Sequence, residues 1–456
     1  MSGRSRSAGT GVGLLNFLAW IRRQAPLRKA YHLIPARGRV ALAGVMAARA
    51  NARVRFSRTP AWDRAVPVVA APAVATADKH APGVNIIGYI RGQFGLAESA
   101  RHYARALINA GVQVRLHDVD LDLPHSWDDR SLEAWIGDDV PHRVSIIFIN
   151  PDFLHQALDK IGRARMANQH LIACWFWELE RIPAPWLPVI AEVDEIMVAS
   201  EFVERAFRRV TDKPVLRIPQ PLEDVPDSGL QRTDFGLEEG KFTFLVTFDF
   251  NSWVARKNPQ AAVQAFLAAF APGRDDVRLV VKSSNGFRHP EAFRALLNAT
   301  ARDPRIIVRD EVIERAHLYA LQRCADAYVS LHRAEGLGLG LAECMAMGKP
   351  VIATGWSGNL EFMTPEAACL VDYTLVPVRE GEYPHAEGAQ WAQADIADAA
   401  RAMRRLADDP AAAAALGLRG QRLVRERLSP ERSANLLKAR LEELEKSDVE
   451  GRASHA

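Results

Sequence analysis

The sequence predicts an α/β protein built from two doubly wound domains that face one cleft. At 456 residues, the chain exceeds the length at which a single hydrophobic core stops growing, so two or three domains are expected. From Val84 onward, short β-branched runs alternate with helical patterns, which is typical of parallel sheets covered by helices. A proline-rich stretch divides this alternation into two sets of comparable length. In such folds ligands bind at the carboxyl ends of the strands.

The elements follow in order along the chain. The first strands are expected at 84–90, 112–118, 144–149, 171–177 and 195–200, with helices in the gaps. The stretch 219–240 holds three prolines and several turn formers, so we place the hinge there. The second strands are expected at 242–249, 277–283, 305–309, 327–331 and 350–354. A last helix is expected over 432–448, where leucines recur at helical spacing at Leu436, Leu437, Leu441 and Leu444.

These patterns set the expected boundaries. Residues 1–80 form a basic arm, 81–222 and 223–430 are the two α/β domains, and 431–456 are a C-terminal helix, packing back across the domains, and a tail. The arm is strongly charged, because residues 1–64 hold 13 Lys and Arg against Asp63 alone, whereas the rest of the chain is acidic. We expect it to bind an anionic membrane surface, because its aromatic residues are too sparse for nucleic-acid stacking. A solvated tail is the alternative.

Other features of the composition restrict the class of protein. With 48% hydrophobic and 25% charged residues, the composition is that of a globular protein. The apolar run from Gly11 to Trp20 is too short to span a membrane and suits an in-plane amphipathic segment. The four cysteines stand far apart, so neither a disulfide framework nor a zinc site is expected. We therefore expect a cytoplasmic protein, peripheral on the inner face of the membrane.

The stretch "HRAEGLGLGLAECMAMGKPVIATGWSGN" (332–359) is the first candidate site. Glu335 follows the strand expected at 327–331, on a loop whose glycines allow close approach of a ligand. A helix is expected from about Gly340, with Glu343 in its first turn. Helix starts suit phosphate, and two flanking carboxylates suit the hydroxyls of a sugar nucleotide. Alternatively, Glu343 only stabilises the helix dipole. His332 is a further candidate for contact with a donor or product, or a structural histidine.

A second candidate is "DFNSWVARKNPQAAVQAF", which begins at Asp249. Asn258 as N-cap and Pro259 at the first helical position predict a helix start. Arg256 and Lys257 then stand beside the positive end of that helix, and an anionic ligand such as a diphosphate would relieve the repulsion. The alternative is a pair of solvated loop charges.

Two candidates lie in the first half of the chain. "NIIGYIRGQFGLAESARHYARAL" places Gly92 and Gly95 between a strand and an amphipathic helix, where they could contact a phosphate or an acceptor, or only form a tight turn. "CWFWELE" (174–180) ends a strand. Trp177 and Glu178 there are candidates for contact with a sugar or acceptor, although alternating tryptophans usually indicate core.

Together, "EGLGLGLAE", the following "MGKPVIATGWSGN" and the preceding "RKNP" resemble the nucleotide-sugar glycosyltransferases of family 4. The resemblance covers roughly Val84 to Leu444. It implies the GT-B architecture of two Rossmann-like domains, with an acceptor domain at 81–222 and a donor domain at 223–430. "CWFWELE" and "VDEIMVASEF" further resemble a bacterial branch that acts in cell-surface polysaccharide assembly.

The resemblance also implies roles for particular residues. Glu335 would contact the donor hexose, Glu343 the ribose, and Lys257 the diphosphate, helped by amides of the stretch Gly338, Leu339, Gly340 and Leu341. The glycine loop of the first domain would close over the donor phosphates. Family members transfer the sugar with retention and need no metal or other cofactor.

The chain departs from the family pattern at two places. Many members carry an arginine six residues before the phosphate-binding lysine, where this chain has Asn251, and Arg256 is the expected substitute. Many also have a histidine at the end of the strand that corresponds to 171–177. This chain has Trp175, Trp177 and Glu178 at that place, so no catalytic histidine can be transferred to it.

The resulting hypothesis is retaining transfer of a hexose from a UDP- or GDP-sugar to a hydroxyl of a lipid-linked or growing saccharide. A retaining glycosidase is disfavoured, because its two carboxyls must lie about 5–5.5 Å apart. The alternatives are a non-catalytic nucleotide-sugar or polysaccharide-binding protein on the same scaffold, and a nucleotide-sugar epimerase. No nucleic-acid partner is expected.

Overall fold

The computed structural model describes residues 83–453 except 124, 126, 225, 226 and 302. It also describes a few positions nearer the N-terminus, namely 20, 24, 26, 27, 30, 33–35, 38 and 39, and beyond residue 446 it describes the backbone alone. Apart from those positions, the basic arm predicted for 1–80 lies outside the described residues. Within the described residues, no helix is both long enough and apolar enough to cross a membrane.

The first sheet has six parallel strands in the order β2-β1-β3-β4-β5-β6. They are β1 (Gly83–Gly88), β2 (Gln113–Asp118), β3 (Val144–Phe148), β4 (His170–Cys174), β5 (Glu195–Val198) and β6 (Val215–Arg217). The helices between them are α4 (Gly95–Asn109), α5 (Pro151–Ile161), α6 (Arg163–Met166), α7 (Leu187–Ile190) and α8 (Glu201–Arg208). The strand predicted at 171–177 is thus shorter than expected, and the tryptophans of "CWFWELE" follow it.

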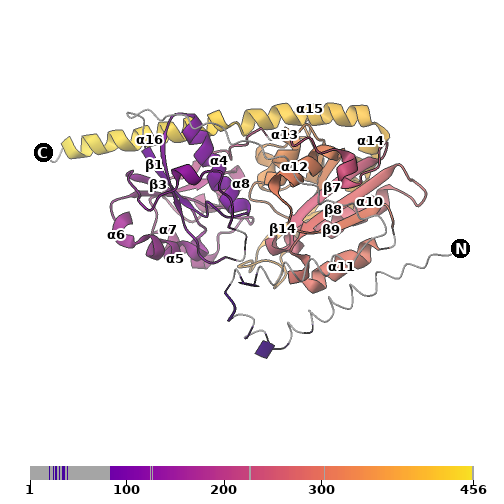
Figure 1. Cartoon of the computed structure of the whole chain (residues 1–456), viewed down its shortest axis with the longest axis horizontal. Helices are drawn as coiled ribbons and strands as arrows, with labels where there is room; N and C mark the ends of the chain where they lie inside the picture. Colours follow the sequence, from indigo (N-terminus) through magenta and orange to yellow (C-terminus); the bar gives the residue numbers. More distant parts are fainter. Residues whose placement is uncertain are drawn as a thin grey trace.

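The second sheet repeats this plan in the order β12-β11-β10-β7-β8-β9, again with parallel pairing. Its strands are β7 (Phe242–Asp249), β8 (Val277–Ser284), β9 (Ile306–Asp310), β10 (Ala327–Ser330), β11 (Val351–Thr354) and β12 (Cys369–Val371). The accompanying helices are α9 (Val254–Lys257), α10 (Pro259–Ala269), α11 (Pro290–Thr300), α12 (Arg315–Cys324), α13 (Leu339–Ala346), α14 (Ile396–Asp408) and α15 (Pro410–Arg427). The predicted fold class, two doubly wound α/β domains, is therefore confirmed (Figure 1).

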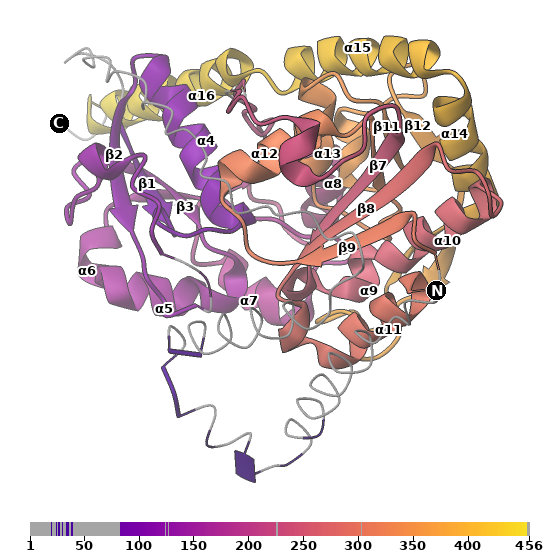
Figure 2. The same cartoon turned by 45° about the vertical axis from the view of Figure 1, so that its right-hand side comes forward.

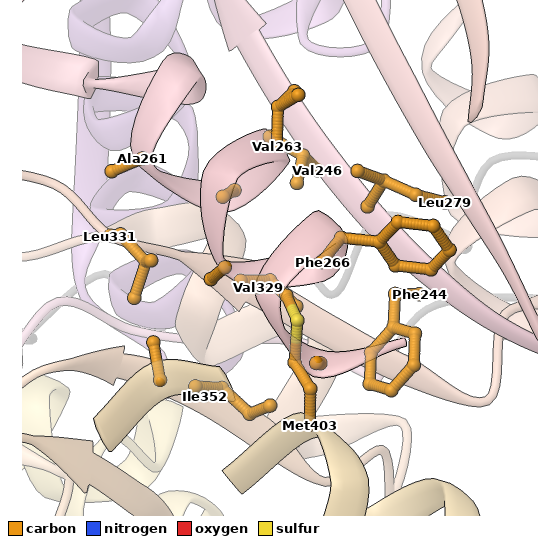
Figure 3. Packing of buried hydrophobic residues seen from close by; sticks show 14 of the residues in the cluster. Phe244, Val246, Ala261, Val263, Phe266, Leu279, Val329, Leu331, Ile352 and Met403 are labelled. Carbon is orange, nitrogen blue, oxygen red and sulfur yellow. The ribbon is translucent and has the colours of Figure 1, made fainter. Parts of the chain in front are cut away.

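The core of the second domain explains why the sequences of its strands are nearly continuous apolar runs. Helices cover both faces of the parallel sheet, so side chains on both faces are buried. Figure 3 shows Phe244, Val329 and Ile352 from the strands packing against Phe266 of α10 and Met403 of α14, and all five are fully buried.

A hairpin that the sequence patterns did not predict joins β12 to α14. Its strands, β13 (Tyr373–Pro377) and β14 (Gln390–Ala394), pair antiparallel to each other. Tyr383 and Trp391 of this segment are buried in the same hydrophobic cluster as Trp177 and Trp186 of the first domain. The hairpin therefore belongs to the second domain in sequence and packs on the first.

The C-terminal helices bridge both domains along one side of the molecule (Figure 1). After α15, helix α16 (Pro430–Ala453) lies against α4, with Leu437 and Leu441 buried in the core of the first domain. The Arg440 guanidinium donates to the buried Glu195 carboxylate, with Nη2 to Oε1 at 2.5 Å. The helix is longer than the predicted 432–448, and its apolar stripe faces the first domain.

Candidate active site

The loop after β10 and the start of α13 form a small cavity at the carboxyl edge of the second sheet. Gly338, with φ +93°, is the residue before the helix, and α13 starts at Leu339. The first amides of a helix have no partner within it and can bind an anion. Lys257, Glu335 and the stretch 338–341 line the cavity. We call it the helix-end cavity.

Glu343 does not lie where the sequence patterns placed it. Because α13 starts at Leu339, Glu343 is its fifth residue, in the second turn, and no acidic residue occupies the first turn. Its carboxylate is 1% exposed and accepts hydrogen bonds from Arg315 and from Gln322 Nε2, the latter at 3.2 Å. Burial raises the Glu343 pKa, and the Arg315 charge opposes this. The prediction that Glu343 stabilises the first turn is therefore wrong, and a ribose contact stays a prediction.

Glu335 is held by both basic residues of the second motif. Its Oε1 lies 2.5 Å from Lys257 Nζ, and its Oε2 lies 2.9 Å from Arg256 Nη1. The carboxylate is nearly buried, which pushes its pKa up, but the charges of Lys257 and Arg256 outweigh burial and hold the pKa well below its usual range. Glu335 is therefore ionised, with a defined orientation, at neutral pH.

Arg256 and Lys257 lie in a short helix of their own, directly before the helix expected from Pro259. Helix α9 begins after Trp253, whose φ is +62°, and ends at Asn258, whose φ is +49°. Asn258 makes no side-chain capping bond; its Nδ2 instead donates to Leu331 O at 3.0 Å, which ties α9 to the end of β10. Pro259 starts α10 as predicted. Glu335 pairs with both cations, and Arg256 also lies 3.6 Å from Glu178 Oε1, so two carboxylates balance the two positive charges at this helix start.

Arg256 lies behind Glu335. Its Nη1 donates to Ala334 O at 2.9 Å as well as to Glu335, and its Nη2 lies 3.6 Å from Glu178 Oε1. It is 5% exposed. We expected Arg256 to replace the arginine that is missing at position 251. In the structure, the Arg256 guanidinium instead positions the carboxylates of Glu335 and Glu178.

Glu178 connects the two domains at this site. It follows β4 of the first domain and accepts a hydrogen bond from the Tyr383 hydroxyl of the hairpin segment. Ser200 Oγ donates to Gly336 O at 2.6 Å and closes the same interdomain contact. Through Arg256, Glu178 is linked to Glu335, so this predicted residue does lie at the site.

Two other predicted residues lie inside the protein. The Trp177 ring is 3% exposed, packs against Trp186 and Tyr383, and donates from Nε1 to Arg181 O at 2.8 Å. It is a core residue, so we withdraw it as a sugar platform. His332 is fully buried and its ring nitrogens lie 3.1 Å from Ser330 Oγ and from Asn359 Oδ1. It supports the loop from within.

A larger cavity lies between the domains. Gly95 and Phe94 at the start of α4 line one side, and Lys282 and Arg315 line the other. In Figure 2, α4 of the first domain lies beside α12 of the second at this place. Gly95 thus lines this cavity, whereas Gly92 forms a turn, with its amide donating to Tyr89 O at 2.8 Å. Contact of either glycine with a phosphate or an acceptor stays a prediction. We call this the interdomain cavity.

Sequence reasoning missed Tyr383, Arg315, Lys282 and Trp253. The hairpin carries no motif, so nothing in the sequence indicated that Tyr383 reaches the first domain. Lys282 is the last but one residue of the predicted strand 277–283, and this position near a strand end was a signal that could have found it. Trp253 lies inside the quoted basic motif; its exposed ring, 43% exposed, meets the Tyr383 ring at 5.9 Å.

Comparisons with solved structures agree with the two-domain fold. The chain is similar to HepE of Anabaena, solved with UDP and glucose, with 15% identity over 79% of this chain and 100% of that chain and a TM-score of 0.57. It is similar to sucrose-phosphate synthase of Thermosynechococcus elongatus, with 17% identity over 80% and 100% and a TM-score of 0.59. It is also similar to the N-terminal domain of trehalose-6-phosphate phosphatase of Candida albicans, with 11% identity over 78% and 95% and a TM-score of 0.54. The fold is GT-B.

The sequence comparison is narrower. Residues 250–409 match the glycosyl transferases group 1 family. This range contains the basic motif, the glycine loop and α13, and the match supports a glycosyltransferase. No curated protein matches the sequence.

Proposed function

We propose that the protein transfers a hexose from a nucleoside diphosphate sugar to a hydroxyl of a lipid-linked or growing saccharide, with retention of configuration. One observation carries this proposal: Lys257 and Glu335 meet in a cavity whose far wall is the N-terminus of α13. A cation and helix amides suit a diphosphate, and an ionised carboxylate beside them suits sugar hydroxyls.

The donor is proposed to be a UDP- or GDP-sugar. HepE has been solved with UDP-glucose, which makes UDP-glucose the first donor to test. In the proposed arrangement the diphosphate lies at the 338–341 amides beside Lys257. Glu335 accepts hydrogen bonds from the hexose, and Glu343 remains a candidate for the ribose.

In the proposed transfer reaction, the main task of the protein is to stabilise the negative charge that develops on the departing diphosphate. The bond from C1 of the hexose to the diphosphate oxygen breaks, and its electron pair stays on that oxygen. The acceptor oxygen bonds to C1 on the same face, and its proton passes to the departing diphosphate. Lys257 and the helix amides stabilise the charge that develops there, which is the largest contribution in such sites.

In this proposal no metal takes part, so transfer should continue in the presence of EDTA. The saccharide product is proposed to belong to a cell-surface polysaccharide, made at the cytoplasmic face of the membrane. For that location the supporting observation is the basic composition of residues 1–64, which would bind anionic vesicles in a salt-dependent way.

The experiment incubates the purified protein with labelled UDP- and GDP-sugars and a membrane extract as the source of acceptor. Wild-type protein should label a saccharide fraction, whereas Glu335→Gln and Lys257→Ala should not. Lys446→Ala, at the exposed end of α16, is the matched control and should transfer normally. Nucleotide binding without transfer to any acceptor would favour a binding protein, and conversion of the donor sugar without acceptor would favour an epimerase.

A further inference from the structure

Lys282 is a buried cation that the site described above does not use. It lies near the end of β8, is 6% exposed, and lines the interdomain cavity. Within the described ranges, no group accepts a hydrogen bond from its ammonium and no carboxylate forms an ion pair with it. Buried ammonium groups are costly unless they are paired. An unpaired one that faces a cavity therefore indicates an anionic ligand.

The sheet register places Lys282 beside the helix-end cavity. Lys282 is directly opposite Thr247 of the neighbouring strand β7, and opposed residues of a parallel pair point to the same face. Thr247 Oγ1 lies 2.7 Å from the Tyr328 hydroxyl, and a Cβ at Gly340 would lie 3.9 Å from it. The backbone of Lys282 therefore lies one strand, about 4.8 Å, from that of Thr247, which lines the helix-end cavity.

The carboxylates near Lys282 form hydrogen bonds with other groups rather than an ion pair with Lys282. Asp249, which lines the same cavity, accepts hydrogen bonds from Asn251 N at 2.7 Å and Asn285 Nδ2 at 2.8 Å. Asp310 accepts from Ser283 Oγ at 2.8 Å and from Gly286 N. Burial lowers the pKa of Lys282, partly opposed by Asp310, Asp249 and Glu311 and reinforced by Arg315.

We propose that Lys282 binds the diphosphate of the donor as a second cation beside Lys257. The chain has Asn251 where the resemblance implies an arginine, and Asn251 Oδ1 is bonded to His289 Nε2 at 3.0 Å. Arg256 cannot supply the missing charge, because it is used by Glu335 and Ala334 O. In this proposal Lys282 of β8, the strand next to β7, supplies the positive charge that is missing at position 251. This inference rests on the proposed function, since it names a further residue of the same donor site.

The test compares the binding of UDP, UMP and uridine, and of GDP, GMP and guanosine, to full-length wild type, Lys282→Met and Lys282→Arg. Binding is measured by calorimetry for the nucleotides and by ligand-observed NMR for the nucleosides. Lys349→Met is the matched control, because Lys349 is a half-buried lysine at the far end of α13. We expect Lys282→Met to weaken diphosphate binding about tenfold or more, the loss of one charge-assisted hydrogen bond. Lys282→Arg should retain most of the affinity, and nucleoside binding should not change.

The melting temperature separates a binding role from a structural one. Lys282→Met should melt no lower than Lys349→Met, because the substitution removes an unpaired buried charge. Diphosphate affinity within twofold of wild type in Lys282→Met, or an equal loss for the nucleoside, would overturn the inference. If wild type binds neither UDP nor GDP, the proposed function itself fails, which is a different result.

Discussion

The two ends of the site differ in how their charges are satisfied. At the end formed by Glu335, Lys257, Arg256 and Glu178, which we call the paired end, each charge has a partner of opposite sign. At the open end, formed by the interdomain cavity, Lys282 has no partner among the described residues and Val312 is 69% exposed. Charges at the paired end stabilise the protein and fix its geometry before a substrate binds. At the open end, Arg315 is paired with Glu343, and Lys282 is left for a ligand.

The largest expected effect is on folding and lies at the paired end. Arg256→Met removes a buried cation shared by Glu335 and Glu178, so it should lower the free energy of unfolding by about 3–5 kcal/mol. Chemical denaturation measures the loss. The comparison predicts that Lys282→Met shows no such loss. A cost at Lys282 as large as that at Arg256 would abolish the distinction between the two ends.

The next effect is on chemistry. Lys257→Ala should lower kcat about 10²–10³-fold, because a preorganised cation at a developing charge contributes that much. The protein should stay folded, because Glu335 keeps its bond to Arg256 at 2.9 Å. Steady-state transfer rates and melting curves measure the two quantities together. A kcat within threefold of wild type would remove Lys257 from the reaction.

A pH-dependent effect is expected at Asp310 of β9, the strand next to that of Lys282. Burial raises the pKa of Asp310 to about 6, above the value of about 3.9 expected when unfolded. Between these values the folded protein binds more protons, so stability falls as pH rises, by about 3 kcal/mol in total. Asp310→Asn lacks this dependence. Urea unfolding should therefore show the stability of wild type relative to Asp310→Asn falling from pH 4 to pH 7. A constant difference would contradict the raised pKa.

The smallest effect concerns the hairpin. Tyr383→Phe removes the hydrogen bond to Glu178 and should cost about 1–2 kcal/mol of stability. Transfer should fall only several-fold, since Arg256 still lies 3.6 Å from Glu178. Denaturation and transfer assays on the same preparation measure both. Tyr373→Phe at the start of β13 is unsuitable as a control, because the half-buried Tyr373 ring packs on Trp356. Tyr31→Phe in the N-terminal arm serves instead.

Residues at strand ends could be predicted from sequence, and long-range partners could not. Glu335 follows a strand and Lys257 precedes a helix, and in a parallel sheet such positions meet at one edge. Trp177 also follows a strand, but the ring faces the core, which the alternation at Trp175 and Trp177 left undecided. Tyr383 comes 205 residues after Glu178, and no periodic pattern relates the two.

The sequence by itself determined the two sheets, the glycine loop and the edge at which the site forms, because these depend on periodicity, helix starts and turn residues that act over a few positions. Only the tertiary structure decided which charges are paired. Lys257 and Glu335 are 78 residues apart, and whether a cation meets a carboxylate or faces a cavity depends on distances through space. For that reason Arg256 of α9 is paired with carboxylates, whereas Lys282 of β8 has no partner among the described residues and faces a cavity.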